Sequence, residues 1–192
     1  HDDFAHHIYN DEYHLVDPDF ASLRPQNNSN WLGQLFSAQR PARTLDYGGG
    51  NGLLAEALRA KGFADVHVYD PFVSEHAARP QGTFDLISSF EVLEHSTTPL
   101  ETMRDMVSLL STPGVIVFST LLRGGPAVNE GINWWYIGPR NGHASIYSPQ
   151  SLQRMIGSFG MTCGSFNAGL HIAFRELPLF AGHLMLSPAP PR

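Results

Sequence analysis

The sequence has few of the features that mark secreted, membrane or nucleic-acid-binding proteins. It holds one cysteine, Cys163, among 192 residues, so no disulfide can form within the chain. Its apolar runs are short, Val115–Phe118 for example, whereas a membrane span needs about 18 apolar residues. The net charge of −6 lacks the basic excess of nucleic-acid-binding domains. We therefore expect a cytoplasmic protein with neither nucleic-acid nor membrane partners.

The N-terminal region is polar and rich in histidine. The sequence starts at His1 rather than Met, so we expect residues to precede it, and no signal peptide is recognisable. The histidines among the first fourteen residues lack the spacing of metal ligands, and no cysteine is near them. We therefore predict no metal site. Residues 1–38 are interpreted as a lid or capping segment with a helix over Asn27–Ala38.

Residues 39–192 alternate strand and helix patterns, as expected of one α/β domain. This alternation, followed by paired strands, predicts a doubly wound, mostly parallel sheet with an antiparallel end. Helical spacing is found over Leu53–Lys61, after a capping box at Thr98–Glu101, and from Ser148 to Phe159. The Thr98 helix is expected to bury Leu100, Met103, Val107 and Leu110. The expected strands are Arg43–Tyr47, Val66–Tyr69, Phe84–Ser88, Val115–Phe118, Met161–Phe166 and Leu170–Phe174.

A cluster of glycines follows the first predicted strand. The run is Asp46-Tyr47-Gly48-Gly49-Gly50-Asn51-Gly52, and a helix pattern begins directly after it. A turn of this kind brings bare backbone and a helix N-terminus close to a ligand, which suits a carboxylate or a phosphate. Asp70, at the end of the second strand, could accept hydrogen bonds from ribose hydroxyls. Both features fit a dinucleotide as well as S-adenosylmethionine, so they do not discriminate between these ligands.

A later segment favours one of these ligands. Phe84 to His95 ends in Glu-Val-Leu-Glu-His, and the whole set resembles the class I S-adenosylmethionine-dependent methyltransferases that act on small molecules. The aromatic stretch Trp134–Ser148 resembles the same subgroup, and the likeness covers about residues 40–175. It implies that the glycine loop wraps the methionine part, Asp70 holds the ribose, and the Phe90–His95 turn borders adenine and the sulfonium. The implied cofactor-binding residues are Asp46, Tyr47, Gly48, Gly50, Asn51, Gly52, Asp70, Pro71, Phe72, Phe90, Glu91 and Val92.

The chain departs from the family between Asp70 and Asp85. Residues 71–84 are too few for a strand with a helix on either side, because even one crossover needs a dozen residues or so. We predict that the third strand of the complete fold is missing or vestigial, which gives the strand order 2-1-4-5-7-6 in the numbering of that fold. Adenine would then be held by Phe72 and by backbone near Ser88–Phe90.

The acceptor is expected to be a small molecule, and a hydroxyl acceptor would need a base. We favour His143 as that base, with His95 as the second candidate. Aromatic residues of the long loop could wall the acceptor pocket or form a satellite core, and Tyr9, Tyr13 and Arg24 could form part of a lid, with Arg24 pairing with the cofactor carboxylate. The aromatic residues are Trp134, Trp135, Tyr136 and Tyr147.

Two other functions stay open at this point. The domain could bind S-adenosylmethionine without catalysis, as part of a larger protein. It could also be a dinucleotide oxidoreductase, although the Glu91–His95 segment disfavours that function. The oligomeric state cannot be inferred from the sequence.

Overall fold

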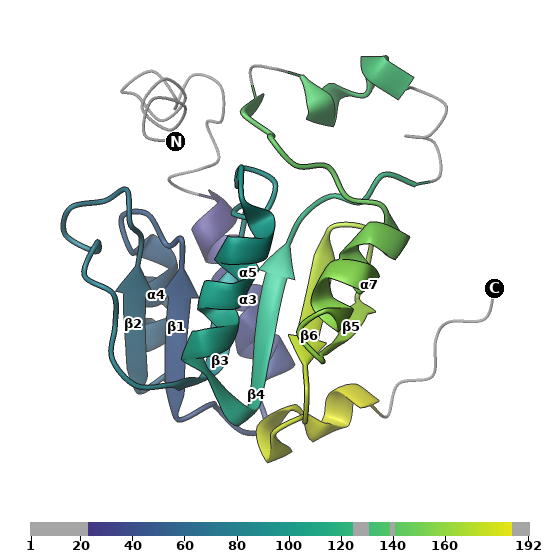
Figure 1. Ribbon diagram of the computed structural model, residues 1–192. Helices are drawn as coiled ribbons and strands as arrows, with labels where there is room; N and C mark the ends of the chain where they lie inside the picture. Colours follow the sequence, from purple (N-terminus) through teal and green to yellow (C-terminus); the bar gives the residue numbers. More distant parts are fainter. Residues whose placement is uncertain (1–22, 125–130, 139–140, 186–192) are drawn as a thin grey trace.

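The structure is a computed structural model that describes residues 23–124, 131–138 and 141–185. Its helices and strands follow one another along the chain in alternation (Figure 1). None of the helices in these residues combines the length and the apolar composition that a bilayer crossing needs. The elements are α3 (Leu23–Leu35), β1 (Arg43–Tyr47), α4 (Leu53–Ala60), β2 (Asp65–Tyr69), β3 (Phe84–Ser89), α5 (Pro99–Leu109), β4 (Leu110–Ser119), η1 (Gly131–Asn133), η2 (Trp135–Ile137), α7 (Pro149–Gly157), β5 (Thr162–Ser165), β6 (Leu170–Phe174) and η4 (Leu179–Met185).

A single six-stranded sheet forms the centre of the fold, in the order β2-β1-β3-β4-β6-β5. The first four strands are parallel, and β6 runs antiparallel to both β4 and β5. Residues 70–83 contain turns but neither helix nor strand. The predicted loss of the third strand and the predicted order 2-1-4-5-7-6 are therefore confirmed. As a result β2 is an edge strand.

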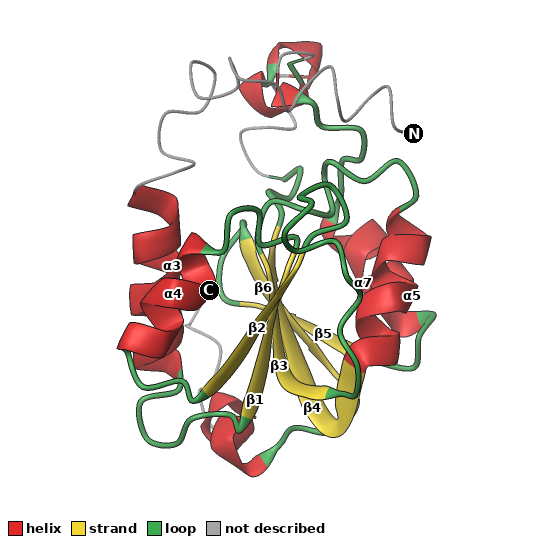
Figure 2. Cartoon of the chain, turned by 90° about the vertical axis from the view of Figure 1, so that its left-hand side faces the viewer, coloured by secondary structure: helices red, strands yellow, loops and turns green. Residues whose placement is uncertain are grey.

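Helices cover both faces of the sheet, which makes the fold doubly wound (Figure 2). The α3–α4 face buries Val115 and Val117 of β4, while the α5–α7 face buries Ile116 and Phe118. This alternation follows from the two-residue period of a strand whose two faces are both covered. Each face thus has its own apolar core.

Helix α3 begins earlier than the predicted Asn27, at Leu23. Pro25 lies in its first turn, where the missing N–H costs no helical hydrogen bond, so it does not delay the start. Leu32 and Phe36 are fully buried against the α4 side of the sheet. Residues 1–22, which carry the rest of the predicted capping segment and its Tyr9 and Tyr13, lie outside the described residues.

The start of α5 also differs from the prediction. Thr98 is the N-cap and Pro99 follows it, but the Thr98 side chain makes no capping hydrogen bond, so the predicted capping box does not form. Ser96 Oγ instead accepts the backbone N–H of Thr98 at 3.2 Å. The buried face consists of Met103, Met106 and Leu109, and Leu100 is half exposed. Of the predicted apolar side, Met103 and Leu110 are buried and Val107 packs against the same core, so Leu100 is the residue that departs from the prediction.

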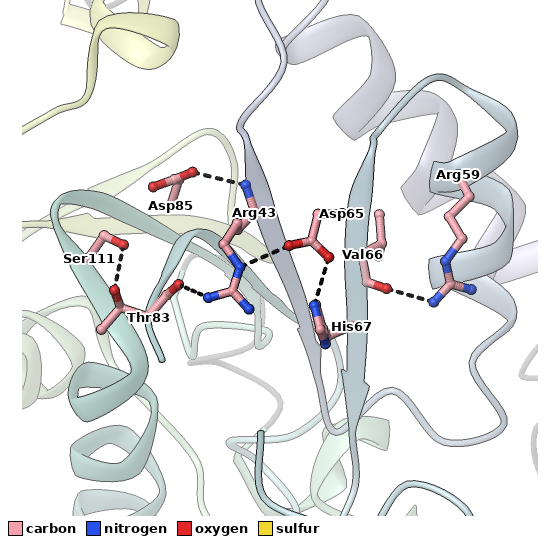
Figure 3. A network of polar contacts seen from close by, with 8 residues as sticks. All are labelled: Arg43, Arg59, Asp65, Val66, His67, Thr83, Asp85 and Ser111. Carbon is pink, nitrogen blue, oxygen red and sulfur yellow. Dashed lines mark hydrogen bonds and ion pairs between the residues drawn. The ribbon is translucent and has the colours of Figure 1, made fainter. Parts of the chain in front are cut away.

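A polar network fastens the first two strands at their amino ends (Figure 3). The Arg43 guanidinium donates to Asp65 Oδ2 and to the Thr83 carbonyl, both at 2.8 Å, and lies 4.6 Å from the centre of the Phe84 ring. The Arg43 backbone N–H donates to Asp85 at 2.9 Å. The 70–83 connection is therefore fastened where it enters β3, at the edge of the sheet formed by the amino ends of the parallel strands.

We expect Arg43→Ala to lower the free energy of unfolding by about 1–2 kcal/mol. The substitution removes a partly exposed ion pair, a hydrogen bond to a carbonyl and a cation–π contact, each of modest value. Urea denaturation would measure the change, with the exposed Arg154→Ala on α7 as the matched control. An unchanged midpoint in Arg43→Ala would contradict the assigned role, since water would then replace these contacts without loss.

Candidate active site

The carboxyl ends of the four parallel strands meet at one edge of the sheet, the upper edge in Figure 1. Loops gather there between the two helical layers (Figure 2). They are the glycine loop after β1, the turn after β2, the Phe90–His95 turn after β3 and the long loop after β4. Open α/β sheets bind their ligands at this edge.

The glycine loop approaches the Phe90–His95 turn closely. Gly48, Gly50 and Gly52 all have positive φ angles, of 71°, 53° and 79°. Glycine adopts these at little cost, unlike residues with a Cβ. A Cβ on Gly48 would also collide with the side chain of Val92. The two segments that the sequence assigned to one cofactor site are therefore neighbours, and they can approach this closely because position 48 carries no side chain.

Asp46 lies beneath this loop and is almost fully buried, with 2% of its surface exposed. Its Oδ1 accepts a hydrogen bond from Ser88 Oγ at 3.2 Å, and its Oδ2 has no partner among the described residues. Burial, together with the nearby charge of Asp70, raises the pKa of Asp46 to about 7. An unpaired buried acceptor is costly, so this oxygen suits a donor from a bound ligand, such as an ammonium group.

Asp70 sits at the end of β2 and orients the glycine loop. Its Oδ2 accepts the N–H of Gly50 and its Oδ1 accepts the N–H of Phe72, each at 2.9 Å. Each carboxylate oxygen can accept two hydrogen bonds, so both keep capacity for a hydroxyl donor. The Asp70 carboxylate is therefore held in place with acceptor capacity to spare, and its expected role at a ribose stays a prediction.

The remaining residues of the expected cofactor site differ in exposure. Pro71, Phe72 and Asn51 are exposed, with 68% of the Phe72 surface accessible, so the Phe72 ring is available for stacking. The Tyr47 side chain is buried on the α5 face of the sheet, where its hydroxyl donates to Asp105 at 3.0 Å. Side-chain contact with a cofactor is therefore open to Phe72, while the Tyr47 ring serves the core.

The turn after β3 is strained at Glu91. This residue has a φ of 56°, a left-handed conformation that few residues other than glycine adopt. Ser119 Oγ at the end of β4 accepts the Glu91 N–H at 2.8 Å and donates to Glu91 Oε1 at 2.9 Å. Such conformations persist where the surroundings over-determine them, often at functional sites.

His95 and His143, the two candidate bases, lie next to each other at this edge. Their ring centres are 4.7 Å apart. The Nδ1 of His95 is 3.2 Å from the Gly142 carbonyl oxygen, and the Nδ1 of His143 is 2.6 Å from that of Tyr136. Burial lowers the pKa of His143, so its ring is neutral at pH 7. One ligand-type atom from each of Glu91, His95 and His143 lies within 4.8 Å of the other two, a grouping that the sequence did not predict.

Glu94 is a buried residue beside the Glu91, His95 and His143 group. It was not among the predicted site residues. It is fully buried, and its Oε1 accepts the Tyr136 hydroxyl proton at 2.8 Å. Its backbone carbonyl accepts the N–H groups of Ala144 and Ser145, which fastens the long loop to the turn. Burial raises the pKa of Glu94 to about 8, with the charge of Glu91 as the next cause. Its place in the Glu-Val-Leu-Glu-His run was the available signal.

Protonation of Glu94 should make the stability of the fold depend on pH. The folded state binds this proton more tightly than the unfolded state, whose pKa is near 4.5, so the free energy of unfolding falls as the pH rises from about 4.5 to 8. Asp46 adds a similar dependence up to about pH 7. Glu94→Gln mimics the protonated acid and is expected to retain about 2 kcal/mol more stability at pH 8, relative to pH 5.5, than the wild type.

Urea denaturation of the wild type and Glu94→Gln at both pH values measures this difference. Glu101→Gln, at an exposed position on α5, is the control and should keep the wild-type dependence. Parallel pH profiles for the wild type and Glu94→Gln would show that Glu94 is ionised in the folded state.

Three of the four aromatic residues of the long loop prove to be core residues. Trp134, Tyr136 and Tyr147 are buried, and the Tyr147 hydroxyl donates to the Leu93 carbonyl at 3.0 Å. Trp135 is 60% exposed. A cavity of about 220 Å³ opens in this loop, with walls of Arg123, Gly131, Ile132, Trp134, Ile137 and Ile146. Its apolar lining suits an apolar acceptor.

Arg24, at the start of α3, contributes positive charge to the same edge. Its charge opposes the rise in the pKa of Glu94 that burial causes, and it adds to the fall in the pKa of His143 that burial causes. The predicted pairing of Arg24 with the cofactor carboxylate stays a prediction.

The sequence of this chain is similar to those of known methyltransferases. A family model described as a methyltransferase domain matches residues 15–164. The ubiquinone biosynthesis O-methyltransferase of Escherichia coli (strain K12 / DH10B) is 30% identical over a match that covers 55% of this chain and 55% of that protein. The chain thus spans about half the length of the curated relatives it matches.

Solved structures show the same fold at lower identity. Magnesium protoporphyrin IX methyltransferase from Synechocystis PCC 6803, with bound S-adenosylhomocysteine, is 19% identical with a TM-score of 0.61, and the match covers 91% of this chain and 94% of that one. An O-methyltransferase family protein from Burkholderia thailandensis is 15% identical with a TM-score of 0.66, covering 91% and 62%. Because the family match spans most of the 192 residues, the chain belongs to this family of class I S-adenosylmethionine-dependent methyltransferases.

Proposed function

We propose that the domain transfers the methyl group of S-adenosylmethionine to a hydroxyl group of a small molecule. The observation that carries this proposal is the position of Glu91 and His95 on the turn that contacts the glycine loop, with His143 of the long loop beside them. The Escherichia coli relative is an O-methyltransferase, which supports oxygen as the acceptor atom. We also propose a cytoplasmic location, which the single cysteine and the composition support.

The proposed cofactor site fits S-adenosylmethionine in its donors and acceptors. The glycine loop offers backbone and space, Asp70 offers acceptors for ribose hydroxyls, and the unpaired Asp46 Oδ2 offers an acceptor for an ammonium group. The exposed Phe72 ring and the Ser88–Phe90 backbone are left for adenine. When bound, this cofactor supplies a methyl group already activated by its positive sulfur, so the protein mainly aligns the donor and the acceptor.

In the proposed reaction, His143 would accept the proton of the acceptor hydroxyl, and His95 would position His143. The Tyr136 carbonyl can only accept, so His143 Nδ1 carries its hydrogen and Nε2 keeps the lone pair. In the proposed reaction this lone pair faces the acceptor hydroxyl, and the oxygen forms a bond to the methyl carbon as the sulfur–carbon bond breaks. His95 rests against His143 and the Gly142 carbonyl, so its proposed part is to hold His143 and the turn in place.

Formation of S-adenosylhomocysteine with a panel of phenols, aliphatic alcohols and primary amines would test the proposal. Transfer of a labelled methyl group to oxygen in at least one class is expected, with apolar phenols favoured because of the cavity at Trp134 and Ile137. Transfer to amines alone would contradict the oxygen acceptor. Tight binding of S-adenosylhomocysteine without turnover on any acceptor would support a non-catalytic binding domain instead.

A further inference from the structure

We propose that Glu91, His95 and His143 form a binding site for a divalent transition-metal ion, with Zn²⁺ the best match to the ligands. One ligand atom from each side chain lies within 4.8 Å of the other two. Two of the residues come from the turn after β3, and the third comes from the long loop after β4. The use of this ion in methyl transfer rests on the proposed function, whereas the binding of the ion does not.

Both imidazoles are oriented as metal-bound histidines usually are. Such histidines donate one ring N–H to a carbonyl or carboxylate and bind the ion through the other nitrogen. The Nδ1 of His95 faces the Gly142 carbonyl and the Nδ1 of His143 faces the Tyr136 carbonyl. Because a carbonyl oxygen only accepts, Nε2 is the lone-pair nitrogen of each ring. The two imidazoles, packed at a ring-centre distance of 4.7 Å, thus bring two candidate metal-ligating nitrogens to one place.

The carboxylate is held in a similar way. Ser119 Oγ donates to Glu91 Oε1 and accepts the Glu91 N–H, so the side chain and the backbone of Glu91 are fixed by one hydroxyl. Hydrogen-bonded carboxylates of this kind are typical of metal sites, because the second partner sets the direction of the ligand oxygen. The left-handed backbone of Glu91 adds an independent sign of constraint at this position.

The ligand set indicates which ion would bind. Two histidines and one carboxylate, with further positions open, form a set found in catalytic zinc sites, whereas Mg²⁺ and Ca²⁺ prefer sites made of oxygen atoms alone. Zn²⁺ bonds of about 2.0–2.2 Å place two ligands of one ion roughly 3.4 Å apart, so the three side chains would close by about an ångström. All three are only partly buried, which leaves room for this movement.

The ion would change how the acceptor loses its proton. A hydroxyl bound to a divalent metal ionises at a much lower pH, because the positive charge stabilises the oxyanion. The proton would leave to solvent, the oxygen lone pair would form the new oxygen–methyl bond, and the electrons of the sulfur–methyl bond would return to sulfur as a neutral thioether. In this case His143 uses its lone pair on the ion rather than on the proton.

Zinc titration of the chelator-treated full chain, followed by calorimetry, tests the site with the metal alone. We expect one strong site per chain, weakened at least tenfold in Glu91→Gln and in His95→Ala. Ser119→Ala should weaken it as well, because Glu91 loses its orienting partner. The chain also carries histidines outside the site, so His183→Ala and a His6→Ala/His7→Ala variant are the controls and should keep the strong site. Circular dichroism checks that each variant is folded.

Cobalt substitution provides a reading that does not depend on the variants. Co²⁺ held by nitrogen and oxygen ligands in a four- or five-coordinate site gives visible absorption bands that free Co²⁺ lacks, and we expect these bands in the wild type. Equal zinc affinity in the wild type, Glu91→Gln and His95→Ala would overturn the site. Absence of the bands together with absence of zinc binding in the wild type would also overturn it.

Activity separates this inference from the proposed function. Chelation is expected to abolish methyl transfer to a phenol, and Zn²⁺ to restore it. If the chain binds no zinc but methylates the phenol, the metal site is wrong and the proposed function stands. If zinc binds at these residues but no hydroxyl is methylated, the site stands and the proposed function is wrong.

Discussion

Replacing His143 with alanine is expected to lower the turnover of a hydroxyl acceptor by about 10²–10⁴-fold, the usual effect of losing a general base. The binding of S-adenosylhomocysteine should change little, because among the described residues the His143 ring is held by Tyr136 and His95 rather than by the glycine loop or Asp70. Turnover and binding are measured separately, by product formation at saturating cofactor and by calorimetry. The same loss is expected if His143 binds an ion instead, but only then would chelation remove the activity of the wild type.

The control for this substitution is His183→Ala, because His183 is exposed in η4, at the opposite end of the sheet (Figure 1). It should keep full turnover. Full turnover in His143→Ala would show that the ring has a structural role, packed against Tyr136 at a ring-centre distance of 4.0 Å. An equal loss of cofactor binding would place His143 in the cofactor site.

Removing the carboxylate of Asp70 is expected to weaken the binding of S-adenosylhomocysteine by about 10–150-fold, which is about 1.5–3 kcal/mol. Asp70→Ala loses charge-assisted hydrogen bonds to the ribose hydroxyls. It also releases the N–H groups of Gly50 and Phe72, which the carboxylate now orients. Calorimetric titration of the wild type and the variant measures the difference.

Glu56→Ala is the matched control, since Glu56 is an exposed acid in the first turn of α4, near the same loop. It should leave the affinity unchanged apart from a small effect of net charge. Wild-type affinity in Asp70→Ala would contradict the ribose role. A comparable loss in both variants would indicate that the negative charge of the region, rather than Asp70 itself, favours the ligand.

The regular elements were predictable because their residue patterns have a period. Strands β1 and β6 have the predicted bounds, and α4 differs from its prediction by one residue. The missing third strand followed from chain length alone, since a strand with a helix on either side does not fit between Asp70 and Asp85. The glycine loop could be located because few other residues adopt its backbone angles.

The details of the candidate site depend on loops, which have no such period. The Glu-Val-Leu-Glu-His run marks this segment as part of the site, but it does not indicate that Glu94 is buried while Glu91 lies near two histidines. That arrangement depends on the left-handed backbone of Glu91 and on Ser119, which belongs to another strand. The capping box at Thr98 was wrong for a similar reason, because Ser96 in the preceding loop competes for the cap.

The attachment of the long loop to the cofactor turn has a thermodynamic consequence. Ala144, Ser145 and Tyr147 all donate hydrogen bonds to the backbone of Leu93 and Glu94, so the loop that carries the proposed acceptor cavity and the border of the proposed cofactor site form one connected unit. A ligand that orders one side lowers the entropy cost of ordering the other. By linkage, if the bound cofactor raises the affinity for the acceptor by some factor, the bound acceptor must raise the affinity for the cofactor by the same factor. Binding of the two substrates is therefore expected to be mutually cooperative rather than independent.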